Sequence, residues 1–166
     1  MTAKVLVAGI GNMLLSDDGF GPEVARQLQA SRSDLPAGVS VVDYGTRGMH
    51  LAYELLDGYD ALVLIDTMPG DRAAGDIVVL AVGPEDVGQG EFNAHGMDPV
   101  TVLGSLEALG GTLPPTFVVG CQPATVEEGI GLSPAVAAAV PEAMTAVRAL
   151  LADRVAEPDL AGTGRP

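Results

Sequence analysis

Four aspartates and one histidine of this sequence stand where they could hold a metal ion. They are Asp17, Asp18, Asp43, Asp66 and His95. Each aspartate follows an apolar segment, and the histidine lies in the long segment after the fourth apolar run. Carboxylate oxygens combined with an imidazole nitrogen suit a divalent ion from Mn²⁺ through Ni²⁺ to Zn²⁺. This chemistry alone does not choose among these ions.

The apolar segments predict five strands that would bring these residues together. They cover residues 4–10, 39–42, 61–65, 77–82 and 116–119. Near-continuous apolar runs indicate strands that are buried on both faces, with helices on both sides of the sheet. Because ligands of such sheets bind at the carboxyl ends of the strands, we expect the four acids and the histidine to converge on one rim.

Helical patterns lie between most of these strands. Two cover residues 22–30 and 48–56, a third begins at Asp98-Pro99, and a fourth begins at Ser133-Pro134. Pro141 should kink or restart the last helix. The link from residue 65 to residue 77 is too short for a helical crossover, so the fourth strand should be antiparallel and at an edge. The predicted fold is α/β, a three-layer α/β/α sandwich with a mixed five-stranded sheet, mostly parallel with strand 4 antiparallel.

Length and composition exclude several classes of protein. The 166 residues fit a single domain over 1–155, and residues 156–166 predict a flexible tail. Acidic residues number 22 against 8 basic ones, and the formal net charge of −14 disfavours nucleic acid and anionic membranes as partners. No apolar run approaches the ~20 residues of a membrane helix, and no signal peptide is evident. With a single cysteine, Cys121, expected as a buried thiol, the sequence predicts a cytoplasmic protein.

Each candidate residue also has a simpler interpretation. Asp17 or Asp18 could cap the helix that begins near Pro22, or the turn before it. Asp66 could accept hydrogen bonds from loop amides, and His95 could be an exposed loop residue. Adjacent residues on a turn point in different directions, so we expect only one of Asp17 and Asp18 to face the site. The spacing does not say which.

A dinucleotide site is a weaker alternative. Gly9-x-Gly11 opens like a phosphate-binding fingerprint, but Leu14 stands where the third glycine is required. Asp17 and Asp18 would also repel a pyrophosphate. The sequence therefore disfavours a flavodoxin-like nucleotide-binding module.

Five motifs along the chain together match a known family. They are Gly9-x-Gly11-Asn12-x-Leu14-x-x-Asp17-Asp18-Gly19-x-Gly21, Asp43-x-Gly45-Thr46-x-Gly48, the strand-terminal Asp66, His95-Gly96-Met97-Asp98-Pro99 and Gly129-Ile130-Gly131-Leu132-Ser133-Pro134. With these motifs the sequence resembles the nickel–iron hydrogenase maturation endopeptidases over nearly all of its length except the tail. The family fold, a three-layer sandwich with a mixed five-stranded sheet, agrees with the element order predicted above.

The resemblance implies a reaction and a set of site residues. Family members remove a C-terminal extension from the hydrogenase large-subunit precursor after nickel insertion, and they cleave after a His or Arg. The implied metal ligands are Asp18, Asp66 and His95, which would act in catalysis through the bound ion. The nickel would come from the precursor. The chain is thus expected to be a nickel-dependent endopeptidase and a monomer, with the precursor as partner and with no nucleic-acid or membrane partner.

The second motif is expected to meet the substrate. We expect Asp43, Gly45 and Thr46 to contact it, with Asp43 orienting substrate or water. Tyr44 stands where many relatives have glycine, and we expect its phenol to reshape the rim near the substrate. We expect His50 to be a surface residue of a helix, without a catalytic role.

Two other functions remain open at the level of sequence. A non-catalytic chaperone of the same fold would bind a nickel protein and cut nothing. A self-sufficient metallopeptidase would carry its own metal and cleave unrelated peptides. The size of the precursor after incubation, with and without nickel, separates the first from the endopeptidase, and the metal content of the isolated protein separates the second.

Overall fold

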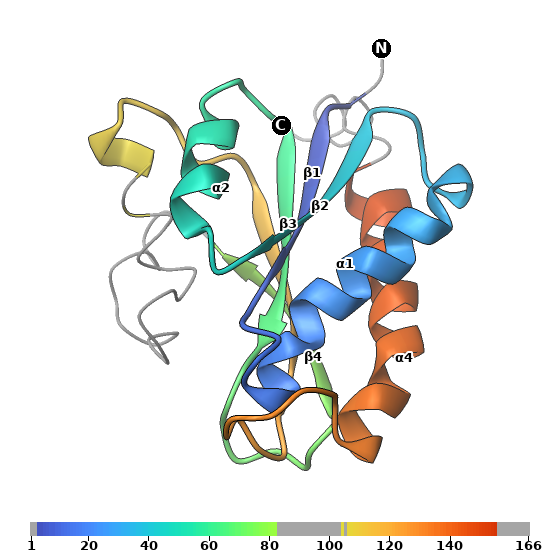
Figure 1. Ribbon diagram of the computed structural model, residues 1–166. Coiled ribbons are helices and arrows are strands. Elements are labelled where there is room, and N and C mark those ends of the chain that lie inside the picture. Colours follow the sequence, from blue (N-terminus) through green and yellow to red (C-terminus); the bar gives the residue numbers. More distant parts are fainter. Residues whose placement is uncertain (1–2, 83–103, 105, 156–166) are drawn as a thin grey trace.

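A five-stranded sheet forms the centre of the computed structural model, which describes residues 3–82, 104 and 106–155. The strands are β1 (Val5–Ile10), β2 (Val39–Gly45), β3 (Ala61–Thr67), β4 (Ile77–Val82) and β5 (Thr116–Cys121). Their order across the sheet is β2-β1-β3-β5-β4. Only β4 runs antiparallel to its neighbour, and it lies at an edge (Figure 1). The predicted mixed sheet with an antiparallel fourth strand is therefore confirmed.

Helices cover both faces of the sheet. On one face α1 (Phe20–Ala30) and α4 (Pro134–Leu150) lie side by side and share a core with β1, β3 and β5, as Figure 1 shows. On the other face α2 (Gly48–Leu55) packs over a second apolar core. Short helical turns complete the fold: η1 (Ser16–Gly19), η2 (Arg32–Asp34) and η4 (Leu151–Val155). The central strands β1 and β5 are buried at every position, as their apolar runs predict.

Three strands extend beyond their apolar runs. β2 continues through Asp43 to Gly45, β3 continues through Asp66 to Thr67, and β5 continues to Cys121. The backbone of β3 remains paired there, because Asp66 lies opposite Gly120 and Thr67 opposite Cys121 on β5. Asp43 and Asp66 are therefore held by strand backbone and do not belong to the loops that follow.

One close contact fixes the start of α1 against the sheet. A Cβ atom at Gly21 would lie 2.3 Å from the carbonyl oxygens of both Ile10 and Ile65. Only glycine permits this approach, because backbone atoms of two strands cannot move aside for a methyl group. α1 and the turn η1 that precedes it are thus set directly against the carboxyl ends of β1 and β3.

The last long helix begins as the sequence predicts. Ser133 is its N-cap, with the Ser133 hydroxyl accepting a hydrogen bond from the Val136 amide, and Pro134 occupies the first turn. α4 continues through Pro141 as one element, so the helix is not restarted there.

The stretch Pro134–Asp153 is long and apolar enough to cross a membrane by length and composition, with a mean hydropathy of 1.5. The expectation that no apolar stretch approaches the ~20 residues of a membrane helix is therefore wrong by length and composition. One face of this stretch packs in the core through Val136, Ala143 and Val147, which is the behaviour of a core helix.

Three predictions fall on residues outside the described part of the chain. They concern His95, the start of a helix at Asp98-Pro99, and the flexible tail 156–166. Within the described part, residues 106–108 are helical and Leu106 is buried in the core beneath α2.

Candidate functional site

The sheet order creates a natural binding position between β1 and β3. From β1 the chain first moves to β2 on one side and then returns to β3 on the other side. The connections after β1 and β3 therefore diverge, and the carboxyl ends of these two strands are the position at which sheets of this kind carry a ligand-binding crevice. The segment after β1 carries Asp18, and the end of β3 carries Asp66 and Thr67.

Asp18 and Asp66 approach the same hydroxyl group in this crevice. Thr67 Oγ1 lies 2.9 Å from Asp18 Oδ1 and 3.5 Å from Asp66 Oδ1. A hydroxyl has one proton, so the shorter contact is its hydrogen bond and Asp18 is the acceptor. Two carboxylates around one neutral hydroxyl form a compact pair of oxygen ligands at the switch point of the sheet.

The Asp18 carboxylate is held at both of its oxygens. Oδ1 accepts a hydrogen bond from the Thr67 hydroxyl, and Oδ2 accepts one from the Asn12 amide at 2.9 Å. The side chain is 6% exposed. A charge with so little access to water is stable only when it is hydrogen-bonded, and here both partners are neutral donors. Its remaining acceptor positions suit a cation.

A glycine lets the segment after β1 fold back beneath Asp18. Gly11 has a φ of 146°, and a Cβ atom there would lie 2.0 Å from the Asp18 carbonyl oxygen. Gly11 also donates its amide to the Gly45 carbonyl at 3.0 Å, which joins the loops after β1 and β2. Gly11 thus serves the close approach of two backbone segments.

The neighbouring Asp17 faces away from Asp18 and is fully buried. Its carboxylate accepts hydrogen bonds from the amides of Ala124, Thr125 and Ser133 and from the Ser133 hydroxyl, at 2.7–3.2 Å. Burial alone would raise the pKa of Asp17, but the bonds from Ser133, Ala124 and Thr125 outweigh it and hold the pKa below its ordinary value. The two adjacent acids therefore point to different partners, as expected for neighbours on a turn. Neither aspartate caps α1, whose N-cap is Gly19 without a side-chain bond.

The second motif lies beside the same rim. Asp43 is half-buried, and its backbone carbonyl accepts a hydrogen bond from Arg47 Nη2 at 2.6 Å. Its Oδ1 lies near Gly45, at 3.8 Å from the position that a Cβ atom on this glycine would take. Gly45 has a φ of 56°, and Thr46 is exposed. These residues are accessible at the end of β2, so their expected contact with substrate stays a prediction.

Two expectations about side chains near this rim have different outcomes. Tyr44 is 6% exposed and packs in the core beneath α2, so the expectation that its phenol reshapes the rim is wrong. Alternation along β2 turns its side chain toward that core. Burial is the main cause that raises the pKa of Tyr44 to about 12. His50 is exposed on α2, as predicted.

Cys121 is fully buried at the end of β5, as its sequence context predicts. Burial, with a smaller contribution from the Asp17 charge, raises the pKa of its thiol to about 12. A thiol of this kind is no nucleophile at neutral pH.

The described residues contain two of the three expected metal ligands. His95 lies outside them, and within the part of the chain that the structure describes no three His, Cys, Asp or Glu side chains gather closely enough to hold a metal ion. Asp18 and Asp66 do come together. Two carboxylates, joined by the expected imidazole, would make a donor set that suits a divalent ion of the nickel type.

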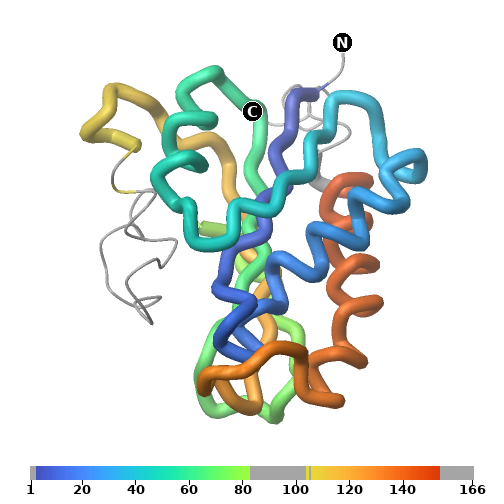
Figure 2. The backbone as a smooth tube through the Cα atoms, in the orientation of Figure 1, coloured from blue at the N-terminus to red at the C-terminus, as the bar shows by residue number. Residues whose placement is uncertain are grey.

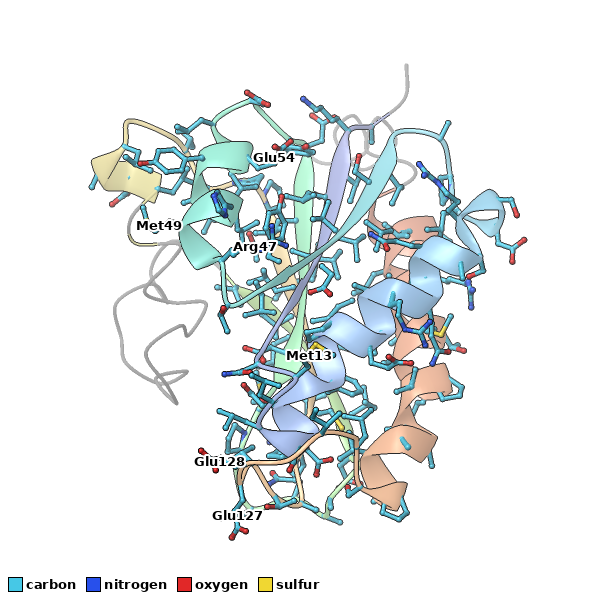
Figure 3. The ribbon with its side chains drawn as sticks, in the orientation of Figure 1. Met13, Arg47, Met49, Glu54, Glu127 and Glu128 are labelled. Carbon is cyan, nitrogen blue, oxygen red and sulfur yellow. The ribbon has the colours of Figure 1, made fainter. Side chains whose placement is uncertain are left out.

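Exposed apolar side chains flank the acidic crevice. Met13 and Leu14 are more than half exposed, and Ile130 is 80% exposed. An open groove of about 360 Å³ beside them is lined by Met13, Gly19, Ile130 and Val140, among others. Figure 3 shows Met13 above Glu127 and Glu128, whose side chains point outward from the lower end of the molecule. The surface around the carboxylates is therefore apolar and acidic.

Two contributors to the site were not predicted. Thr67 follows Asp66 directly, and a hydroxyl residue after a strand-terminal acid was a possible signal for it. The partners of Asp17 lie more than 100 residues away, and no pattern in the sequence indicates them.

The chain is similar to known proteins in sequence and in fold. Residues 22–150 match the family model HycI, described as hydrogenase maturation protease. Hydrogenase 2 maturation protease of Escherichia coli is 31% identical over 152 residues, which cover 89% of this chain and 90% of that protein. The hydrogenase expression/formation protein HupD of Rhodobacter capsulatus is 32% identical over 153 residues, 88% of this chain and 72% of that protein.

A solved structure shares the whole architecture. The hydrogenase maturating endopeptidase HybD from E. coli superposes with a TM-score of 0.78 at 28% identity, covering 90% of this chain and 93% of that one. The family model alone matches well over half of the sequence. This chain therefore belongs to the hydrogenase maturation protease family.

Proposed function

We propose that this protein is an endopeptidase that removes the C-terminal extension of a nickel–iron hydrogenase large-subunit precursor after nickel has been inserted. The observation that carries the proposal is the convergence of Asp18 and Asp66 on the Thr67 hydroxyl at the switch point of the sheet. Membership of the hydrogenase maturation protease family supports the reaction class and the kind of partner.

Nickel enters this proposal as part of the substrate. Asp18, Asp66 and His95 would close on the ion that the precursor already holds. An ion so placed can polarise a carbonyl group and lower the pKa of bound water. The same contact would report that metal insertion is complete, since a precursor without nickel would offer the acidic crevice no cation.

The charge of the protein supports a basic cleavage segment. Asp18, Asp43 and Asp66 lie at the ends of the loops and strands of this rim, and the chain carries a formal net charge of −14. A negative rim attracts a divalent cation and a peptide that carries a His or Arg at its cleavage point. Asp43, with its half-buried side chain, would orient such a peptide or the attacking water. We place the reaction in the cytoplasm, with the protein acting as a monomer.

The experiment is incubation of the purified protein with nickel-loaded large-subunit precursor, followed by mass measurement of the precursor. The wild-type protein should release one C-terminal peptide, while Asp18→Ala, Asp66→Ala and His95→Ala should release none. Asp34→Ala is the matched control, because Asp34 is an exposed acid in η2 at the end of α1 that lies away from the rim. Binding of the precursor without any change in its mass would favour the chaperone, and cleavage of unrelated peptides would favour a general metallopeptidase.

A further inference from the structure

Asp17 is a buried carboxylate that the proposed reaction does not use. It is fully buried, and all of its acceptor bonds come from residues 124–133, the segment that connects β5 with α4. Four donors on one carboxylate nearly fill its acceptor capacity. Ser133 is also the N-cap of α4, because its hydroxyl accepts a hydrogen bond from the Val136 amide.

The same segment is also bonded to the backbone at Asp17 and at the residues just before it. The Asp17 amide donates to the Thr125 carbonyl at 3.1 Å, and the Ser16 amide donates to the Gly129 carbonyl at 2.8 Å. In return, the Gly129 amide donates to the Leu14 carbonyl at 2.9 Å. Figure 2 shows the two segments, far apart in the sequence, side by side at the lower end of the molecule.

The turn that these bonds hold is one that the backbone does not favour by itself. Ser16 has a φ of 55°, which lies in the left-handed region that residues other than glycine rarely adopt. Its hydroxyl donates to the Glu127 carbonyl at 2.7 Å, so the same segment stabilises this conformation. A strained turn persists only where its surroundings determine it. If the segment is released, Ser16 is free to relax, and Asp18 lies only two residues further on.

We propose that Asp17 is a positioning residue: by fastening residues 124–133 to η1, it fixes the backbone from which the Asp18 carboxylate reaches Asn12 and Thr67. The positional claim stands on the hydrogen bonds alone, and its consequence for cleavage rests on the proposed function. Asp17 touches neither Asp66 nor Thr67 in any described contact and acts only through the backbone of Asp18.

The substitution Asp17→Asn tests this with little change of volume. An amide has one oxygen, and its NH₂ group would face donors that the carboxylate accepts, so at least one of the four bonds is lost and replaced by two donors facing one another. If Asp17 had a purely local role, the substitution would change amide exchange only at the residues that donate to Asp17. If Asp17 positions Asp18, the substitution must also speed exchange of the Asn12 amide, because that amide donates to Asp18 Oδ2.

The readout is amide hydrogen exchange of the full-length protein followed by NMR. In Asp17→Asn we expect the Asn12 amide to exchange at least about tenfold faster than in wild type. The Gly11 amide is the internal control, since it donates to the Gly45 carbonyl and should keep its protection. Faster exchange at Ala124, Thr125 and Ser133 with an unchanged Asn12 amide would overturn the proposal.

A second pair of variants covers the case in which Asp17→Asn does not fold. Ser133→Ala removes one donor to Asp17, whereas Ser133→Thr keeps the hydroxyl for both Asp17 and the helix cap. Faster Asn12 exchange in Ser133→Ala than in Ser133→Thr supports the positioning role, and equal exchange in the two contradicts it.

Cleavage of nickel-loaded precursor gives the functional arm. Asp17→Asn should lower kcat about tenfold or more and leave KM within about twofold, because the misplaced Asp18 lies at the reacting centre and not on a distant contact surface. Wild-type kcat in a folded Asp17→Asn protein would overturn the inference. If the wild-type protein itself leaves the precursor uncut, the proposed function fails, and hydrogen exchange alone decides the positional claim.

Discussion

The hydroxyl of Thr67 donates a hydrogen bond to Asp18 across the carboxyl ends of β1 and β3, at 2.9 Å. The same hydroxyl lies 3.5 Å from Asp66, so one neutral group sits between the two acids. The Thr67 amide also donates to Asp66 Oδ1 at 2.7 Å. Thr67 therefore contacts both acids and links them across the ends of the two strands.

Substitution of Thr67 should separate positioning from folding. Thr67→Val keeps the shape and removes the donor to Asp18, so we expect kcat/KM for precursor cleavage to fall roughly 10- to 100-fold. Thr67→Ser keeps the hydroxyl and should retain most of the activity. Circular dichroism checks that both variants fold. Equal activity of the Val and Ser variants would show that the hydroxyl has no role.

The contact between α1 and the sheet should tolerate no side chain at Gly21. Gly21→Ala places a methyl group against two strand carbonyls, and we expect the free energy of unfolding to fall by about 3 kcal/mol. Gly70→Ala is the matched control, because its nearest neighbour is the far end of the Arg72 side chain at 3.2 Å. Urea denaturation of both variants measures the difference. Similar losses in the two proteins would contradict the close packing of α1.

The buried thiol of Cys121 should be inert in the folded protein. Its pKa is raised from 9.0 to about 12, mainly by burial, so it stays protonated at neutral pH. We expect no reaction with a thiol reagent at pH 8 until the protein is unfolded in urea. Rapid modification of the native protein would show that the thiol is accessible.

The raised pKa of Cys121 also has a consequence for stability. As the pH rises, the thiol of the unfolded chain loses its proton before the thiol of the folded chain does. The free energy of unfolding therefore keeps the full contribution of the protonated Cys121 below pH 9.0 and loses it progressively between pH 9.0 and about 12. Urea denaturation at pH 8 and pH 10 should show a smaller loss for Cys121→Ser than for wild type, because serine does not titrate. Equal losses of stability in the two proteins would contradict a raised pKa of Cys121.

The isolated protein should carry little nickel of its own. Two carboxylates and an imidazole with no thiolate make a modest site, and we propose that the precursor supplies the ion. We expect substoichiometric nickel in the purified protein by mass spectrometry of metals. Treatment of the protease with a chelator, followed by its removal, should leave cleavage of nickel-loaded precursor unchanged. Loss of activity that nickel restores would instead indicate a resident metal.

Much of the fold could be predicted from local pattern. The apolar runs identified all five strands, and the short link before Ile77 predicted an antiparallel β4. The ends of β2 and β3 were missed, because Asp43 and Asp66 look like loop residues while their pairing depends on a neighbouring strand. Tyr44 was misplaced for the same reason: the extra strand residues turn its ring into the core.

The site could be predicted less completely. The rim position of Asp18 and Asp66 followed from the strands that precede them. The division of roles between Asp17 and Asp18 did not, since it depends on donors near Ser133, far along the chain. The spacing of two adjacent acids does not tell them apart, and only the family resemblance implied Asp18 as the ligand. The hydrogen bonds of the folded chain show Asp17 bonded to residues 124–133 and Asp18 in contact with Thr67.

We propose that this protein cuts a nickel-loaded precursor and leaves a nickel-free one intact. The mass of the same large-subunit precursor, with and without nickel, tests this most directly, before and after incubation with the wild-type protein and with Asp18→Ala. We expect loss of one C-terminal peptide, ending the product at a His or Arg, only when nickel and Asp18 are both present. Cleavage without nickel, or cleavage by Asp18→Ala, would contradict it.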